Sequence, residues 1–357
     1  MMMRDGNISG PKKKKFTTKC RPFSFYKNRH IIMLINDESI YLYNLTLKPP
    51  SYYISSIVGQ FYKQDNSTKN AQQLVLVSST TLQLFEINEE TGKLELQSSQ
   101  NLLGIINSIE KICLSEVDGV VITSDSGNLS ILQYDNKTKK FISKIQEPMT
   151  KNGWGRNYVG ENLAIDPENR CILVAAMEKN KLFYKIESNS LGSKELSSPL
   201  EAHSKQVLCL KIVALNTDHN NPLFGALELT PEKKCIINYY ELDQGLNHVV
   251  KKKPNSSNLD PLPNDVNYLI PLPGHIGGMV VCGTNWCFYD KLDGPRIYLP
   301  LPRRNGQTQD SIIVNHVTHV LKKKKFFILL QNALGDLFKL TVDYDFDKEI
   351  IKNISIT

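Results

Sequence analysis

The sequence has no long hydrophobic run. Near its start the longest uninterrupted apolar stretch, residues 31–35, is five residues long, far short of the roughly 20 that a membrane-spanning helix needs. No apolar segment of the kind found in secretory leaders follows the N-terminus. We therefore expect a protein that neither contacts a membrane nor is exported.

Paired cysteines are also lacking. The seven cysteines form no Cys-x-x-Cys pair and stand apart at positions 20, 113, 171, 209, 235, 282 and 287. An odd, unclustered set in a chain without a leader is typical of free thiols in a reducing compartment. The cysteines therefore predict no disulfide framework.

The motifs of common catalytic sites are absent too. The sequence contains no Gly-x-x-x-x-Gly-Lys-Ser/Thr phosphate loop, no Gly-x-Ser-x-Gly nucleophile turn and no His-Glu-x-x-His pair. Cys282 and Cys287, followed by His316 and His319, vaguely resemble a zinc site. However, side chains three apart on a strand point to opposite faces, so the two histidines cannot readily turn to one metal. We expect neither a bound metal nor a cofactor.

Two other histidines, His203 and His248, lie in short polar stretches. Either could act as a general base, but no nucleophile or paired carboxylate accompanies it at a diagnostic spacing. We therefore expect these histidines to stabilise turns, and the chain not to be an enzyme.

Positive charge is confined to the N-terminal tail. Residues 1–30 hold nine of the 43 Lys and Arg and one of the 36 acids, so residues 31–357 carry 34 bases, 35 acids and a net charge of −1. Because phosphate neutralisation supplies most of the affinity for nucleic acids, this neutral body predicts weak, non-selective RNA binding. We expect residues 1–38 to lack stable structure, except that residues 31–35 could form a strand.

The tail contains the run Lys12, Lys13, Lys14 and Lys15. Such a run suits a nuclear localisation signal. The alternative is a solvated basic tail that no receptor recognises.

One design repeats six times along the rest of the chain: an apolar, β-rich run, a short polar turn and a second β run. The first runs begin about 50 residues apart. The six pairs are residues 74–77 with 82–87, 120–122 with 129–134, 172–174 with 182–186, 224–229 with 235–240, 279–281 with 286–289, and 326–330 with 337–342. Hairpin turn residues occur at 125–128 and 332–336.

A period of about 40–50 residues with hairpins throughout is typical of a β-propeller, with one four-stranded blade per repeat. The runs at 74–77 and 326–330 are apolar at consecutive positions, as in strands covered on both faces. The sequence therefore predicts an all-β fold, a β-propeller over residues 39–357 that lacks the Trp-Asp dipeptide of WD40 repeats. A pair of β-sandwiches or two barrels is the alternative.

We expect the six hairpins to be the inner or outer strand pairs of successive blades. Six of their side chains should then be buried: Leu74, Val121, Leu173, Leu227, Val280 and Ile328.

Two kinds of basic residue could contact a partner. The lysine runs 251–253 and 322–325 are not interleaved with aromatic residues that could stack on bases. Arg303 and Arg304, directly after a Pro-Leu-Pro segment, are better candidates, since the arginine fork binds carboxylate or phosphate through two hydrogen bonds.

Six stretches resemble a known family: residues 43–47, 124–129, 163–167 with 178–182, 197–203, 240–250 and 302–304. The family is that of large triple-propeller subunits. It includes those of splicing factor 3b in the U2 small nuclear ribonucleoprotein and of the cleavage and polyadenylation specificity factor, and the damaged-DNA-binding adaptor of cullin ligases. Residues 197–203 and 240–250 are most similar to the first propeller of the splicing member.

The resemblance implies a non-catalytic scaffold in the nucleus, acting in pre-mRNA splicing at branch-site recognition. Its implied partners are the helical-repeat and small subunits of splicing factor 3b, with indirect association with small nuclear RNA and pre-mRNA and no small-molecule substrate. It also implies a seven-bladed propeller, incomplete in this chain. Family members open near Tyr41, so the basic tail is an extension. The candidate partner contacts are Arg303, Arg304, Asn247, His248 and His203.

Two alternative functions remain. One is an adaptor in mRNA 3′-end processing or in cullin-linked DNA repair. The other is a propeller hydrolase with its site at the central channel, although no cluster of acids or histidines recurs at equivalent positions of successive repeats.

Overall fold

The computed structural model describes residues 31–35, 41–45, 52–63, 72–88, 90–114, 116–149, 163–177, 180–188, 194–203, 208–215, 221–252, 262–274, 276–321, 325–345 and 350–357. The chain divides into two units, Met1–Tyr52 and Tyr53–Thr357. In the first unit, β1 (Ile31–Ile35) pairs antiparallel with β2 (Tyr41–Leu45), so residues 31–35 form the strand that the sequence allowed. The expected boundary between residues 38 and 39 stays a prediction.

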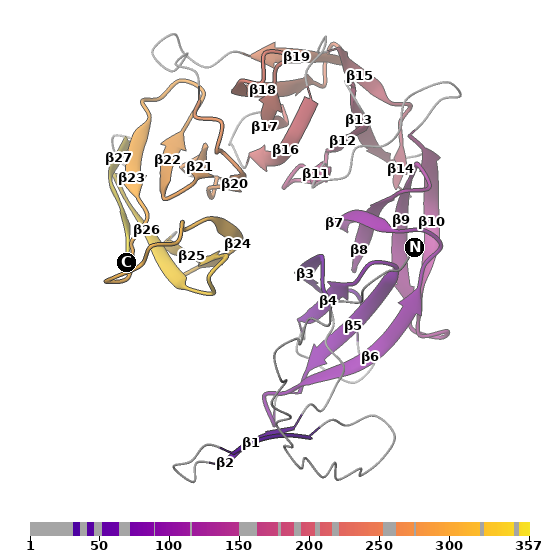
Figure 1. Ribbon diagram of the computed structural model, residues 1–357. Coiled ribbons are helices and arrows are strands. Elements are labelled where there is room, and N and C mark those ends of the chain that lie inside the picture. The colour runs from indigo at the N-terminus through magenta and orange to yellow at the C-terminus, as the bar shows by residue number, and fades with distance from the viewer. Residues whose placement is uncertain are drawn as a thin grey trace, which may run out of the picture. The chain divides into compact units, whose positions relative to one another are not determined.

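The second unit consists of six antiparallel sheets, called the first to the sixth sheet in chain order (Figure 1). The first three sheets comprise β3 (Ser55–Gly59), β4 (Gln73–Val77), β5 (Thr81–Ile87) and β6 (Leu94–Asn101); β7 (Ile106–Cys113), β8 (Asp118–Ser124), β9 (Asn128–Asp135) and β10 (Lys140–Pro148); and β11 (Leu163–Ile165), β12 (Cys171–Met177), β13 (Asn180–Ser188), β14 (Lys194–Leu196) and β15 (Leu200–His203). In the third sheet β14 and β15 both pair with β13, and so share the fourth position.

The last three sheets are regular four-stranded meanders. They comprise β16 (Leu208–Leu215), β17 (Leu223–Leu229), β18 (Cys235–Asp243) and β19 (His248–Lys252); β20 (Tyr268–Pro271), β21 (Met279–Gly283), β22 (Trp286–Asp290) and β23 (Ile297–Pro300); and β24 (Ile313–Val320), β25 (Phe326–Asn332), β26 (Leu337–Asp345) and β27 (Ile350–Ile356). No helix of the length and apolarity that a membrane crossing requires occurs among the residues described.

Successive sheets meet through their first strands. β3 contacts β7, β7 contacts β11, β11 contacts β16, β16 contacts β20, and β20 contacts β24. Some fourth strands also meet, as β6 with β10 and β23 with β27. Figure 1 shows that the first strand of each sheet is the inner strand and the fourth the outer strand, as in the blades of a propeller. The fold is a partial β-propeller of four-stranded blades, as the sequence predicts, and its six sheets do not close into a ring. A seventh blade stays a prediction.

The six repeating hairpins are the middle strand pairs, so the prediction that they are inner or outer pairs is wrong. They correspond to the second and third strands of each sheet, for example β4 with β5 and β25 with β26. The reason is burial. A middle strand has neighbours on both edges and both faces, and in β8 six of the seven residues are buried. The outer strand β6 has no fully buried residue, so its sequence carries no apolar run.

The hydrophobic core consists of five clusters, each shared by two successive sheets. The cluster between the third and fourth sheets, for example, packs Leu173 and Phe183 against Phe224 and Tyr240. Both faces of the second to fifth sheets are therefore covered. This explains why Val121, Leu173, Leu227, Val280 and Ile328 are all buried, as predicted.

The first and sixth sheets each share only one such cluster. Leu74, on the face of β4 turned away from the second sheet, is half-buried rather than buried, so this part of the core prediction is wrong. On the sixth sheet Val317 and Leu337 are 56% and 69% exposed. The expectation of burial failed at Leu74 because, among the described residues, no sheet packs on that face.

Candidate protein-interaction site

The connection between β23 and β24, residues 301–312, carries the two candidate arginines and is held at its base by one residue. Asn285, in the turn between β21 and β22, donates its backbone N–H to the Ser311 oxygen (2.9 Å), and its own oxygen accepts the Leu301 N–H (3.0 Å). Its side-chain Oδ1 accepts the Ser311 N–H at 2.8 Å. Asn285 has a φ of 66°, a left-handed conformation that asparagine tolerates better than most residues. Both ends of the loop are therefore fixed to the same turn.

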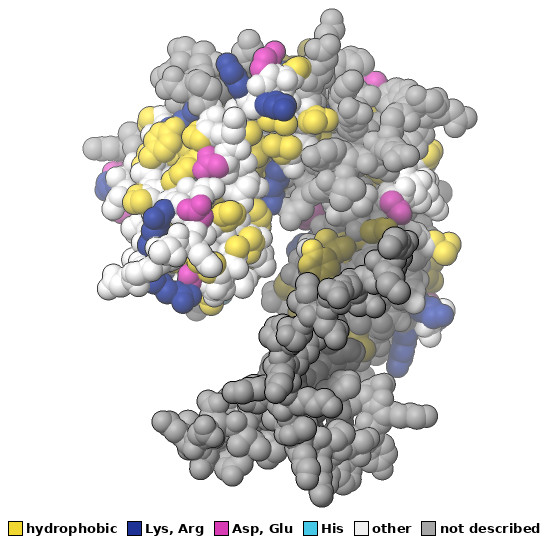
Figure 2. All heavy atoms as spheres, in the orientation of Figure 1, with side chains coloured by type: hydrophobic (Ala, Val, Ile, Leu, Met, Phe, Trp, Pro, Cys, Tyr) yellow, Lys and Arg dark blue, Asp and Glu magenta, His cyan; other side chains and the backbone are white. Residues whose placement is uncertain are grey.

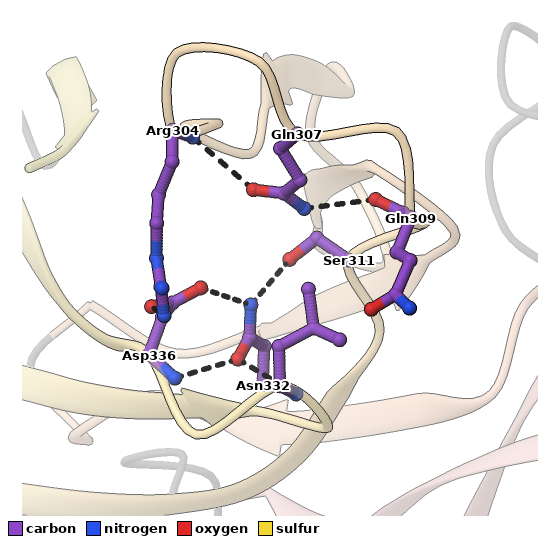
Figure 3. A network of polar contacts seen from close by, with 7 residues as sticks. Arg304, Gln307, Gln309, Ser311, Asn332 and Asp336 are labelled. Carbon is purple, nitrogen blue, oxygen red and sulfur yellow. Dashed lines mark hydrogen bonds and ion pairs between the residues drawn. The ribbon is translucent and has the colours of Figure 1, made fainter. Parts of the chain in front are cut away.

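A second turn, between β25 and β26, supports the loop from the other side. The side chain of Asn332, which is 1% exposed, donates to Ser311 Oγ (3.0 Å) and Asp336 Oδ2 (3.1 Å). Its Oδ1 accepts the backbone N–H groups of Leu334 and Asp336. Gly335 has a φ of 86°, which glycine adopts without steric cost. This turn, predicted from residues 332–336, thus presents Asp336 to the loop (Figure 3).

Arg304 spans the space between the loop and this turn. Its backbone N–H donates to Gln307 Oε1 (3.1 Å), and the Gln307 N–H donates to the Arg304 oxygen (3.1 Å). Gln307 Nε2 in turn donates to the Gln309 oxygen at 2.8 Å. The Arg304 guanidinium forms an ion pair with Asp336 through Nη2. As Figure 3 shows, the two segments are therefore tied together by a continuous polar network.

This network borders a surface pocket of about 380 Å³. Among its lining side chains only Arg304 is charged. The pocket is lined by Arg304, Asn305, Gly306, Gln307, Thr308, Gln309 and Leu334. Arg303 is exposed beside the pocket but does not line it.

The other candidate contacts lie elsewhere. Asn247, with a φ of 52°, lies in the turn between β18 and β19, and His248 begins β19; both are exposed. In this turn Asp243 Oδ1 accepts the N–H groups of Gly245 and Leu246. His203 ends β15, where its backbone lies opposite that of Asn180; its side chain and residues 12–15 lie outside the described part.

The candidates therefore do not form one site. The β18–β19 turn joins the third and fourth strands of a sheet, whereas residues 301–312 lead from a fourth strand to the next sheet. In an antiparallel meander these two kinds of connection leave from opposite ends of the strands. Arg303 and Arg304 are thus separated from Asn247 and His248.

The sequence did not identify Asn285, Asn332 or Asp336 as parts of a site. Residues 332–336 could be recognised as a turn, but the Arg304–Asp336 pair joins residues 32 apart. No pattern in the neighbouring sequence predicts such a contact. The one feature that could have indicated it is an asparagine in a tight turn next to a connection that contains arginine.

The described residues contain no group of three or more His, Cys, Asp and Glu that could hold a metal. Cys282 and Cys287 lie opposite each other on β21 and β22, both buried. Burial raises the pKa of the Cys287 thiol to about 12 and that of Cys282 well above its ordinary value. His316 Nδ1 lies 3.1 Å from the Tyr268 hydroxyl, and the His319 ring lies against Phe327.

Residues 54–357 match the model of a protein family described as the RSE1/DDB1/CPSF1 first beta-propeller. The chain belongs to this family. The resemblance inferred from the short stretches is therefore confirmed over the whole propeller.

Several similar proteins are named as splicing factors or spliceosome-associated proteins. The chain is 99% identical over 357 residues to pre-mRNA-splicing factor RSE1 of Candida albicans, covering 100% of this chain and 29% of that protein. It is 47% identical to pre-mRNA-splicing factor RSE1 of Debaryomyces hansenii, over 91% of this chain and 26% of that protein. It is 32% identical to spliceosome-associated protein 130 A of Arabidopsis thaliana, over 86% of this chain and 26% of that protein. The chain thus spans less than a third of these relatives.

Proposed function

We propose that this propeller is a non-catalytic protein-interaction scaffold of the splicing factor 3b complex, acting in the nucleus in pre-mRNA splicing at branch-site recognition. The observation that carries the proposal is similarity across the propeller itself. A yeast relative at 47% identity and a plant relative at 32% both bear splicing or spliceosome names. The proposed partners are the helical-repeat and small subunits of that complex.

The surface supports protein binding more than direct RNA binding. Residues 31–357 carry a net charge of −1, which gives little counterion release on contact with a phosphate backbone. Among the coloured side chains in Figure 2, basic, acidic and hydrophobic residues are interspersed, without a continuous basic field. We therefore infer that contact with small nuclear RNA and pre-mRNA is made through other subunits.

The architecture supports binding more than catalysis. The described residues include no group of three or more His, Cys, Asp and Glu that could hold a metal ion, and the burial of Cys171 and Cys209 raises the pKa of both thiols. Because the thiolate is the nucleophile, such thiols are inert at neutral pH. The β23–β24 loop instead offers a fixed polar surface.

An adaptor role in mRNA 3′-end processing or cullin-linked DNA repair is the second candidate, since the family description also names DDB1 and CPSF1. Rapid depletion of the endogenous protein, followed by RNA sequencing, separates the two. The splicing proposal expects intron-containing transcripts to accumulate within the first hours. Read-through past polyadenylation sites with normal intron removal would overturn it.

A further inference from the structure

The Arg304 guanidinium has unused hydrogen-bonding capacity. A guanidinium carries five N–H donors. Within the described residues its side chain has one partner, the Asp336 carboxylate at Nη2, so Nε, Nη1 and the second N–H of Nη2 remain available. The Arg304 side chain is 67% exposed, whereas that of Asp336 is 14% exposed. Among the described residues, one of the two edges of the guanidinium, either Nε with Nη2 or Nη1 with Nη2, is therefore left without a partner on a largely exposed side chain that lines the pocket.

The loop holds this arginine in place before any partner arrives. Its backbone is fixed by two hydrogen bonds with Gln307, and its side chain by Asp336. Asp336 is itself held by Asn332. Since an arginine otherwise loses much rotamer entropy on binding, a fixed guanidinium costs less to engage.

The rest of the lining indicates what could bind. Asn305, Thr308 and Gln309 offer amide and hydroxyl groups, and Leu334, 37% exposed, offers a short apolar surface. None of the lining residues is aromatic, so unpaired bases have nothing to stack on. The volume lies near the lower end of the range of ligand pockets, about 300–1,000 Å³. These properties suit a short polar peptide segment.

Charge favours one carboxylate over a polyanion. Arg303 and Arg304 are balanced by Asp310, which accepts from Asn285 Nδ2, and by Asp336. The four charged residues of the loop 301–312 and of the turn 332–336 therefore sum to a formal charge of zero, which does not attract a phosphate chain. A single carboxylate needs only the arginine fork, which matches its planar geometry.

We propose that this pocket binds an extended polar segment of a partner protein, with one Asp or Glu carboxylate on the edge of the Arg304 guanidinium that Asp336 leaves open and an adjacent aliphatic side chain on Leu334. The inference deepens the proposed scaffold function and rests on it. Arg304 is the specificity-determining residue, and Gln307 and Asp336 are positioning residues.

The first test identifies the segment. A photo-crosslinking amino acid replaces Thr308, and in a second strain Asn305, in the tagged endogenous protein, and the crosslinked peptide is identified after irradiation of the purified complex. The proposal expects a protein segment that contains at least one Asp or Glu. A crosslink to RNA, a segment without an acid, or no crosslink from either position would overturn it.

The second test measures the contact. Synthetic peptides of that segment, with each acid intact or replaced by its amide, are titrated against the complete protein carrying Arg304→Gln or Arg303→Gln. Arg303→Gln removes the same charge beside the pocket and is the matched control. We expect Arg304→Gln to weaken Kd by about 10-fold to 100-fold and Arg303→Gln by less than about 2-fold. We further expect the amide peptide to bind both variants equally.

Equal losses in the two variants, or an Arg304 effect that persists with the amide peptide, would refute the pocket assignment. The set of proteins that co-purifies with each variant is recorded in parallel. If that set still consists of splicing factors while the peptide test fails, only the pocket inference falls. If the set contains no splicing factor, the proposed function itself falls.

Discussion

Replacing Lys181 with methionine should strongly destabilise the propeller. Lys181 Nζ, on β13, lies 2.5 Å from Glu228 Oε1, on β17, and the two side chains are 1% and 0% exposed. Glu228 also accepts hydrogen bonds from the Tyr240 hydroxyl (2.6 Å) and from Asn238 Nδ2 (2.5 Å). Without the lysine, the buried carboxylate would keep only neutral donors among the described residues.

The expected cost follows from the burial of that charge. Removing one partner of a buried ion pair costs about 3–5 kcal/mol, against a total stability of about 5–15 kcal/mol for a domain. Replacing both charges is expected to be nearly neutral, because no uncompensated charge remains. Lys181→Met combined with Glu228→Gln should therefore recover most of the loss.

Equilibrium unfolding in urea, followed by circular dichroism, measures these differences as shifts of the midpoint at a constant slope. The matched control is Lys352→Met. Lys352 lies 3.1 Å from Asp345 and is 59% exposed, so we expect a loss of less than about 1 kcal/mol. If Lys181→Met cost no more than this control, the argument from buried charge would be wrong.

Four further predictions concern other parts of the chain. Val121→Asp should unfold the propeller, since the substitution loses roughly 1.5–3 kcal/mol of apolar burial and buries a charge. Val317 is exposed, so Val317→Asp should leave the propeller folded, and thermal unfolding of the two variants compares them. Burial raises the pKa of Cys287 from 9.0 and that of Tyr184 from 10.0, both to about 12. As pH rises from about 9 towards 12, both groups stay protonated in the folded chain but ionise in the unfolded chain. The free energy of unfolding should therefore fall over this pH range. Deleting residues 11–15 should abolish nuclear accumulation of a fluorescent fusion, whereas unchanged accumulation would leave a solvated tail. A longer chain that covers the exposed faces of the first and sixth sheets should melt higher and sediment as a cleaner monomer, and equal midpoints would refute this.

Much of the fold could be predicted because the middle strands carry continuous apolar runs. β8 and β17 are buried at six of seven positions each, and this double coverage is visible in the sequence as a repeat. The outer strand β6 and the inner strand β24 lack such runs because most of their residues are exposed. The position of each hairpin within its blade could therefore not be inferred. Buried Lys181 also could not be foreseen, since lysine is almost always exposed unless paired.

Only part of the candidate site could be predicted from the sequence. The adjacent Arg303 and Arg304 could be identified, because two arginines directly follow a Pro-Leu-Pro segment. What fixes Arg304 is Asp336, held by Asn332 on another hairpin. Such contacts depend on how successive sheets pack together. Neither the spacing of residues along the sequence nor its composition predicts that packing.

The identity of the bound partners tests the central claim most directly. The endogenous protein, tagged at its gene, is captured under native conditions and its partners are identified by mass spectrometry. The account predicts the helical-repeat subunit and small subunits of splicing factor 3b, in amounts comparable to the tagged protein. Recovery of a cullin or of polyadenylation factors, without these subunits, would contradict it.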